Sequence, residues 1–227
     1  MKKIIAVVMV VLLLLCTEAL AYPQLRFVHQ QGGSVYGILI KNTTAFVNET
    51  SKVTVYDISN PNSPQYINEI SYGGSAVRLT AQRGNYLFVA YEKVMRVYNI
   101  ADKNNIRDVA GYRHDSSYVT AITVDSNYVY LAAHSKGLCI ISASDSILKN
   151  WDNTKALTAV YTGGFGIITA IKKVGNYLYM GTNSTGAEHC GALVIADILN
   201  PRVPVEKAYY SILHLDNAEK FMRVSQV

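Results

Sequence analysis

A short apolar stretch recurs along the 227-residue sequence, and this repeat restricts the possible folds more than any other feature. Its clearest copies read LVIADILNPRVP at 193–204 and VTVYDISNPNSP at 53–64, an apolar run followed by Asp and then Asn-Pro-x-x-Pro. Weaker copies read MRVYNI at 95–100 and LCIISA at 138–143. A turn and an aromatic strand precede each copy, and the matched aromatic residues are Phe46, Phe88, Tyr130 and Tyr179.

The spacing of this pattern predicts an all-β fold. The matched aromatic residues lie 42, 42 and 49 positions apart. A period of this size that contains only short strands is typical of a β-propeller blade. The second unit divides into strands at 77–81, 86–91, 94–98 and 109–113, with a tight turn at 83–85. We therefore predict a β-propeller of four-stranded blades.

The repeats extend over 22–227, with about four complete units. The units cover 34–72, 75–115, 118–162 and 165–214. Residues 23–28 resemble the last strand of a unit and 221–225 the first, so orphan terminal strands flank the blades. We expect a truncated or partial propeller, with a self-sufficient four-blade ring as the alternative. An insert at 144–158 is the best helical candidate, with at most a turn or two of helix.

The N-terminus has the pattern of an export signal. A basic start precedes an apolar run at 4–15 and a small-x-small site at 19–21, so residues 1–21 are predicted to be a secretory signal peptide. The apolar run is too short to span about 30 Å of hydrocarbon. A membrane anchor and a lipoprotein acylated at Cys16 are the alternatives. We expect a secreted, extracellular-surface or periplasmic protein with no membrane span after signal removal.

The distribution of charge bears on possible partners, and the cysteine content bears on disulfide formation. The formal net charge of +5 is dispersed without a Lys/Arg block, so we expect no nucleic-acid partner. Cys139 lies inside an apolar run and Cys190 in a loop. A buried thiol with a free loop thiol and a disulfide both remain open, because the sequence does not supply the geometry.

The repeat motif resembles the LVIVD repeat family. The resemblance rests on the Asp-Ile-x-Asn-Pro-x-x-Pro endings and the Gly-Asn-Tyr-Leu-Tyr turn before them, and covers roughly 22–227. It is strong in the first and fourth units; the second departs at Met95, Arg96 and Asn99, and the third departs at Ser142 and lacks Asn-Pro. The resemblance implies a β-propeller, usually exported or surface-exposed. It implies no activity, and its motif residues are structural, so no catalytic residue carries over.

The histidines of the chain all map to loops on one face of the predicted propeller. In a propeller, the loops between second and third strands and those between blades lie on the same face. All five histidines map to these loops, as do several carboxylates. Convergent imidazoles and carboxylates would form a metal or polar-ligand site, whereas histidines of distant blades would not meet. The candidate ligand-binding residues are His114, Asp115, His134, Glu188, His189 and His214.

These features favour a binding scaffold over an enzyme. The sequence has no nucleotide loop, zinc-type spacing or Gly-x-Ser-x-Gly elbow. We expect an exported or cell-surface propeller that binds a protein or glycan, with no catalytic residue and no identifiable cofactor. An extracytoplasmic enzyme, or a metal-binding or ligand-binding protein, that uses the histidine-bearing loops is the alternative. Possible N-glycosylation sequons begin at Asn42, Asn48 and Asn183.

Overall fold

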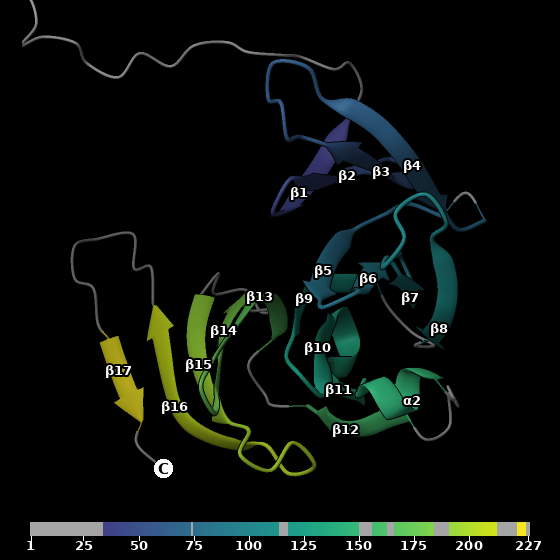
Figure 1. Ribbon diagram of the computed structural model, residues 1–227. Coiled ribbons are helices and arrows are strands. Elements are labelled where there is room, and N and C mark those ends of the chain that lie inside the picture. The colour runs from purple at the N-terminus through teal and green to yellow at the C-terminus, as the bar shows by residue number, and fades with distance from the viewer. Residues whose placement is uncertain are drawn as a thin grey trace, which may run out of the picture.

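The predicted all-β propeller architecture is confirmed. A computed structural model of the chain describes residues 34–73, 75–113, 118–149, 156–162, 166–183, 191–212 and 222–225. These residues form four antiparallel sheets, one for each repeat unit, which we call blades 1 to 4. Figure 1 shows the blades following one another around an arc, with blade 1 and blade 4 at its two ends.

Three blades have four strands and blade 4 has five. Blade 1 contains β1 (Val35–Lys41), β2 (Thr44–Glu49), β3 (Lys52–Asp57) and β4 (Gln65–Ser71). Blade 2 contains β5 (Leu79–Arg83), β6 (Tyr86–Ala90), β7 (Val94–Asn99) and β8 (Arg107–Arg113). Blade 3 contains β9 (Val119–Val124), β10 (Tyr128–Ala133), β11 (Gly137–Ser142) and β12 (Leu157–Tyr161). Blade 4 contains β13 (Ile167–Val174), β14 (Tyr177–Asn183), β15 (Gly191–Asp197), β16 (Val205–Ile212) and β17 (Met222–Ser225).

In the described part of the chain, two short helical elements lie in blade 3. A 3-10 turn, η1 (His134–Lys136), joins β10 to β11. The helix α2 (Asp145–Lys149) lies between β11 and β12, in the insert where helix was expected, and residues 150–155 of that insert lie outside the described residues. Among the described residues, no helix combines the length and apolar character needed to cross a membrane.

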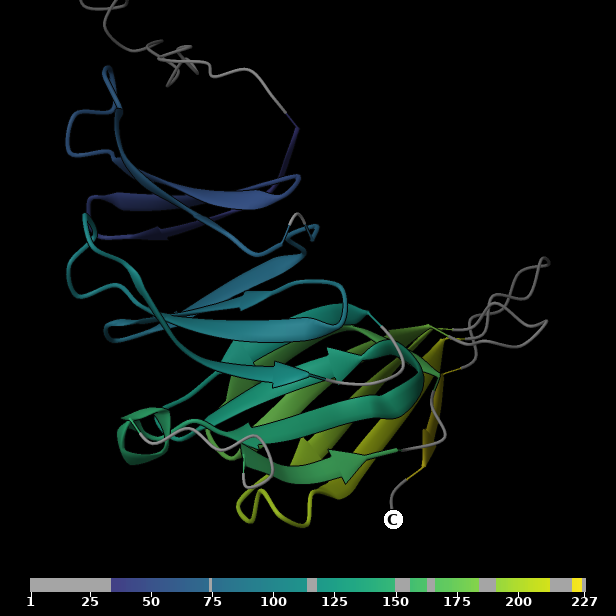
Figure 2. The ribbon, with the colours of Figure 1, turned by 90° about the vertical axis from the view of Figure 1, so that its right-hand side faces the viewer.

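The first strand of each blade lies at the inside of the arc. β1 contacts β5, β5 contacts β9, and β9 contacts β13. Successive strands of a blade pair antiparallel, so each blade runs outward from the centre. Figure 2 shows the sheets stacked face to face along the arc. This arrangement buries both faces of the inner blades, which explains why their central strands are apolar on both sides.

The hydrophobic core lies between the blades. Between blades 1 and 2, Phe46 packs in one cluster with Leu87. Between blades 2 and 3, Phe88 and Leu131 share a second cluster. Between blades 3 and 4, a third cluster includes Tyr130. Because neighbouring residues of a strand point to opposite faces, each blade contributes alternate residues to the cluster before it and the cluster after it.

The acidic or amide residue at the end of the third strand caps the following turn in blades 1, 2 and 4. Asp57 accepts a hydrogen bond from the backbone N–H of Ser59 at 2.8 Å. Asn99 accepts one from the backbone N–H of Ala101 at 3.0 Å. Asp197 accepts one from the backbone N–H of Leu199 at 2.9 Å. These side chains mimic a backbone turn and thereby end the strand.

Cys139 is a free thiol in the core. It is fully buried between blades 2 and 3 and lies in the same cluster as Phe88. Burial raises the pKa of this thiol, although a hydrogen bond with Tyr112 opposes the rise. Cys139 therefore behaves as a small apolar residue, while Cys190 lies outside the described residues.

The C-terminal strand differs from the prediction. The sequence favoured 221–225 as the first strand of a further blade, but β17 pairs antiparallel with β16 and becomes the outermost strand of blade 4. The edge of β16 offers backbone groups that a following strand can pair with locally, which explains the placement. The predicted N-terminal strand at 23–28 and the predicted signal peptide at 1–21 lie outside the described residues.

Candidate functional site

The structure describes one residue of the predicted histidine-bearing face. His134 begins η1, and its ring lies against Tyr118 with ring centroids 4.7 Å apart. The other five candidates, His114, Asp115, Glu188, His189 and His214, lie outside the described residues. Within the part of the chain that is described, no group of three or more His, Cys, Asp or Glu side chains is placed to hold a metal ion. The convergence of these side chains stays a prediction.

The three sequons occupy different environments. Asn42 lies in the turn between β1 and β2, with a positive φ of 52°. Asn183 is exposed at the end of β14. Asn48, in contrast, is only 3% exposed in β2. Its side chain packs so closely against Gly37 that a Cβ atom added to this glycine would lie 3.2 Å from the Asn48 amide nitrogen. A glycan on Asn48 has no room in this fold, whereas glycosylation of Asn42 and Asn183 stays a prediction.

The opposite face of the arc carries a polar groove. Here the turns between first and second strands lie beside the connections between third and fourth strands, and we call this side the turn face. One hollow of about 470 Å³ lies between blades 2 and 3. A second hollow of about 220 Å³ lies between blades 1 and 2. Both are lined by Gly84 and Asn85, the turn of blade 2 that lies between them, and we call the two hollows together the turn groove.

Amides, hydroxyls and aromatic rings line the turn groove together with charged side chains, which include Lys41 and Lys103. The larger hollow includes Tyr86, Asn99 and Ser126, and the smaller includes Asn42 and Thr44. An amide side chain offers both donors and an acceptor, and a hydroxyl can do either. The groove can therefore bind a ligand that carries many hydroxyl groups.

Gln82 adds an unsatisfied acceptor to the wall of the smaller hollow. Its amide nitrogen donates to the carbonyl oxygen of Gly84 at 3.1 Å. Its side-chain oxygen is buried and has no hydrogen-bond partner among the described residues. Buried acceptors of this kind are uncommon in folded proteins, because each one costs free energy when it leaves water.

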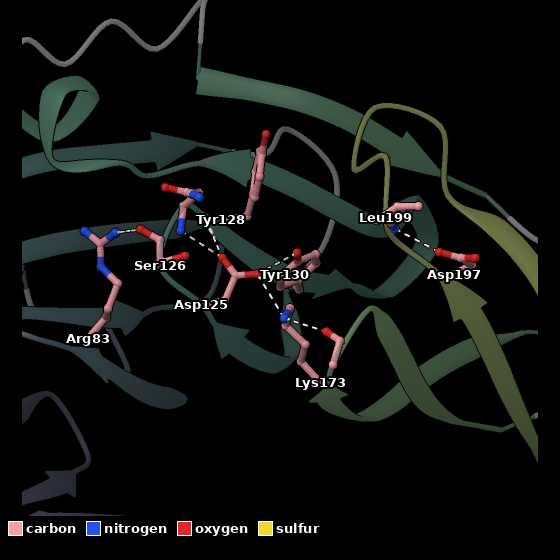
Figure 3. Close-up of polar contacts among 10 residues, drawn as sticks. Arg83, Asp125, Ser126, Tyr128, Tyr130, Lys173, Asp197 and Leu199 are labelled. Carbon is pink, nitrogen blue, oxygen red and sulfur yellow. Dashed lines mark hydrogen bonds and ion pairs between the residues drawn. The ribbon is translucent and has the colours of Figure 1, made fainter.

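Arg83 joins blade 2 to blade 3 at the floor of the turn groove. Its guanidinium donates to the backbone oxygen of Ser126, a contact visible in Figure 3. It also donates to the carboxylate of Asp145 in α2 at 2.8 Å, and it lies 5.6 Å from the ring centroid of Tyr86. With these partners, Arg83 has a structural role, and we call such a polar contact between neighbouring blades a joint. The neighbouring amides are the groups open to a ligand.

Asp125 makes the corresponding joint between blades 3 and 4 (Figure 3). Its carboxylate accepts the backbone N–H groups of Asn127 and Tyr128 at 2.9 and 2.8 Å. The hydroxyl of Tyr130 donates to its second oxygen at 2.9 Å, and the ammonium group of Lys173 lies 3.4 Å away. The carboxylate is thus surrounded by donors on every side that the described residues provide.

These contacts determine the ionisation of Asp125 and Tyr130. Burial alone would raise the pKa of Asp125, but the two backbone hydrogen bonds, the Tyr130 hydroxyl and the Lys173 charge outweigh it, so the pKa lies below its usual range. Burial and the neighbouring carboxylate raise the pKa of Tyr130. A carboxylate held ionised by four partners stabilises a joint and is a poor proton donor or acceptor near neutral pH.

Sequence reasoning did not identify these joints. Arg83 and Asp125 occupy the same position of successive units, two residues before the matched Asn85 and Asn127 of the turns. Because the two side chains have opposite charges, the sequence does not indicate that they have equivalent roles. A single sequence also does not indicate that both side chains contact the next blade. The turn residues of the groove were interpreted only as turn formers.

The chain belongs to the LVIVD repeat family. The family model matches residues 32–70, 117–146 and 166–211, which together are about half of the chain. These stretches correspond to blades 1, 3 and 4. The unmatched unit is the second, which departs from the motif at Met95, Arg96 and Asn99. No curated protein matches the sequence.

Several solved structures share the fold at low sequence identity. The computationally designed Ika4 protein aligns with a TM-score of 0.55 and 14% identity, over 69% of this chain and 89% of its own. The designed Ika8 protein gives 0.51 and 12%, over 80% and 68%. A chain of the Mitotic Checkpoint Complex gives 0.57 and 11%, over 80% of this chain and 58% of its own. Identities this low show the fold alone.

Proposed function

We propose that this protein is an exported β-propeller scaffold that binds a glycan at the cell surface through the turn groove. The observation that carries the proposal is the pair of polar hollows on either side of the blade 2 turn at Gly84 and Asn85, which together extend over blades 1 to 3. Propeller folds place such grooves on a rigid framework, since the blades hold the turns in fixed positions. The sugar hydroxyls of a glycan match the mixed donors and acceptors of the groove.

The ligand test compares two equivalent asparagines. Asn85 lines both hollows, and Asn176 occupies the same turn position in blade 4, outside the groove. Both side chains are exposed, so an alanine at either position leaves the fold unchanged. An array of surface polysaccharides, probed with the purified protein, would identify bound glycans.

We expect Asn85→Ala to weaken glycan binding by roughly fivefold to tenfold, equivalent to one lost hydrogen bond of about 1 kcal/mol. Asn176→Ala should bind like the wild type. Equal loss in the two variants, or no glycan bound by the wild type, would contradict the glycan proposal. Binding to a purified surface protein that Asn85→Ala weakens would show that the groove serves a protein partner instead.

Export is tested separately by the intact mass of the protein recovered outside the cytoplasm. The proposal predicts a chain that begins at residue 22, after loss of 1–21. A chain that retains the apolar run at 4–15 would contradict signal cleavage. The mass would also reveal any glycan on the sequons at Asn42 and Asn183.

A further inference from the structure

The two ends of the arc expose blade faces of the kind that the interior buries. We call the side of a blade that meets the next blade its forward face, and the other side its backward face. Between blades 3 and 4, the forward residues Tyr130, Leu138 and Ile140 are at most 1% exposed. The forward face of blade 4 and the backward face of blade 1 have no neighbouring blade among the described residues (Figures 1 and 2).

The forward face of blade 4 repeats the buried pattern of blade 3. Leu193 occupies the motif position of Leu138, and Tyr177 occupies that of Tyr128. Tyr128 packs against the cluster between blades 3 and 4, whereas Tyr177 is 41% exposed and Leu193 39% exposed. Val174, at the position where Asp125 forms its joint, is 55% exposed. The surface therefore has the composition of an interface.

The backward face of blade 1 repeats the buried pattern of blade 3 in the same way. Ile38 and Ile40 in β1 occupy the positions of Ile122 and Val124 in β9, which pack against blade 2. Ile38 is 61% exposed and Ile40 is 63% exposed. An apolar hollow of about 230 Å³ lies on this face, lined by Ile38 and by residues of β2, β3 and the turn after it.

The charged groups of the two faces are complementary. On the blade 1 face, Lys52 pairs with Glu49 and Glu69, which leaves an excess of negative charge. On the blade 4 side, Lys207 pairs with Asp197, and Lys172 is exposed in β13, which leaves an excess of positive charge. Opposite net charges favour contact between the two faces over contact of either face with itself.

We propose that a second copy of this chain covers both faces, blade 4 of each copy packing against blade 1 of the other. Two such head-to-tail contacts close a ring of eight blades from two arcs of four. A heterologous contact of this kind forms a closed ring when its rotation returns to the starting copy. The exposed apolar side chains of the blade 1 face extend from β1 to Tyr66 in β4.

Two face variants and a matched control test the proposal. Leu193→Glu places a charge on the blade 4 face, and Ile40→Glu does so on the blade 1 face. Leu199→Glu places the same charge at a side chain that is 75% exposed in the turn after β15. Native mass spectrometry of the purified protein reports the number of chains, and circular dichroism confirms that each variant is folded.

The wild type and Leu199→Glu should contain two chains. Each face variant should dissociate, with the dissociation constant raised about 100-fold or more by the buried charge. A mixture of the two face variants should restore pairs, because one contact in each mixed pair joins two unaltered faces. Ile38→Lys provides a second blade 1 variant with the same expected outcome.

Three results would overturn the proposal. A wild type that stays a single chain at micromolar concentration would show that another partner covers the faces. Pairs that survive Ile40→Glu but dissociate in Leu193→Glu would indicate a symmetric contact between blade 4 faces. Open polymers in place of pairs would show that the contact does not close.

Discussion

The interface between blades 3 and 4 and the free face of blade 4 are built from the same repeat position. Leu138 is fully buried in the interface, while Leu193, its counterpart one blade later, is 39% exposed. Both belong to a third strand, and both point forward along the arc. The difference shows that burial in a repeat protein depends on the neighbouring blade, and the motif alone does not determine it.

The polar joints show the same contrast. Asp125 connects blade 3 to Lys173 of blade 4, and Arg83 connects blade 2 to blade 3. At the free end the corresponding residue is Val174, which is apolar and 55% exposed. The interfaces between blades 2 and 3 and between blades 3 and 4 combine apolar packing with a charged joint, whereas the end face is apolar at the position where the joint would be.

The largest expected effect comes from the two equivalent leucines. Leu138→Ala should lower the free energy of unfolding by about 2 to 5 kcal/mol, because it leaves a cavity in a packed interface. Leu193→Ala should cost less than about 1 kcal/mol when the face is uncovered. Urea unfolding of both variants in the Ile40→Glu background measures the difference without any contribution from assembly.

Equal losses for the two leucines in that background would contradict the comparison, since they would mean that the blade 4 face is already covered within one chain. In the background without Ile40→Glu, the cost of Leu193→Ala should increase with protein concentration. The free energy of unfolding of Leu138→Ala should increase with protein concentration no more than that of the wild type does.

The next effect is that of the charged joint. Asp125→Asn should lower the free energy of unfolding by about 1 to 3 kcal/mol, because it weakens hydrogen bonds to an ionised group and removes the pairing with Lys173. Thermal unfolding at pH 7 measures this loss. Asp145→Asn is a suitable control, because the side chain of Asp145 is 69% exposed and its ion pair with Arg83 contributes little.

The joint also predicts a pH dependence with a definite sign. The folded pKa of Asp125 lies below its unfolded value, which is about 3.9 for aspartate. The stabilisation is therefore complete above about pH 5 and is lost as the pH falls through the folded pKa. The wild type should lose stability more steeply than Asp125→Asn below pH 4, and parallel acid unfolding curves would contradict the assigned role.

The smallest effect concerns two tyrosines at equivalent positions of the fourth strands. The Tyr161 hydroxyl donates to Glu206 of blade 4 at 3.3 Å, and burial together with that carboxylate raises the pKa of Tyr161 to about 12. Tyr161→Phe should cost about 0.5 to 1.5 kcal/mol. Tyr210 pairs with Leu193 as Tyr161 pairs with Leu138, and Tyr210→Phe should cost less in the Ile40→Glu background. Chemical unfolding at neutral pH compares them.

The period of the sequence was sufficient to predict the blades. Aromatic residues at matched positions, with Asp or Asn at the end of three of the four third strands, placed the strands within a few residues, although β5 begins at Leu79, where the pattern favoured 77. The placement of β17 was not predictable, because its residues resemble a first strand and the available edge of β16 is visible only in three dimensions.

The candidate site was less predictable than the fold. The turn groove combines turn residues from separate units, each of which has a sufficient local explanation as a turn former. The Asp125 and Arg83 joints depend on the distance between blades, which no spacing in the sequence encodes. Histidine positions suggested a site on the other face, and of those residues the structure describes His134 alone.

The mass of the purified wild-type protein in solution tests the central claim most directly. Sedimentation equilibrium over a range of micromolar concentrations distinguishes one chain from two. The comparison between interior and end faces predicts a two-chain assembly that dissociates on dilution, because each end face has the composition of a buried interface. A single chain at every concentration, with Leu193 and Ile40 still exposed, would contradict it.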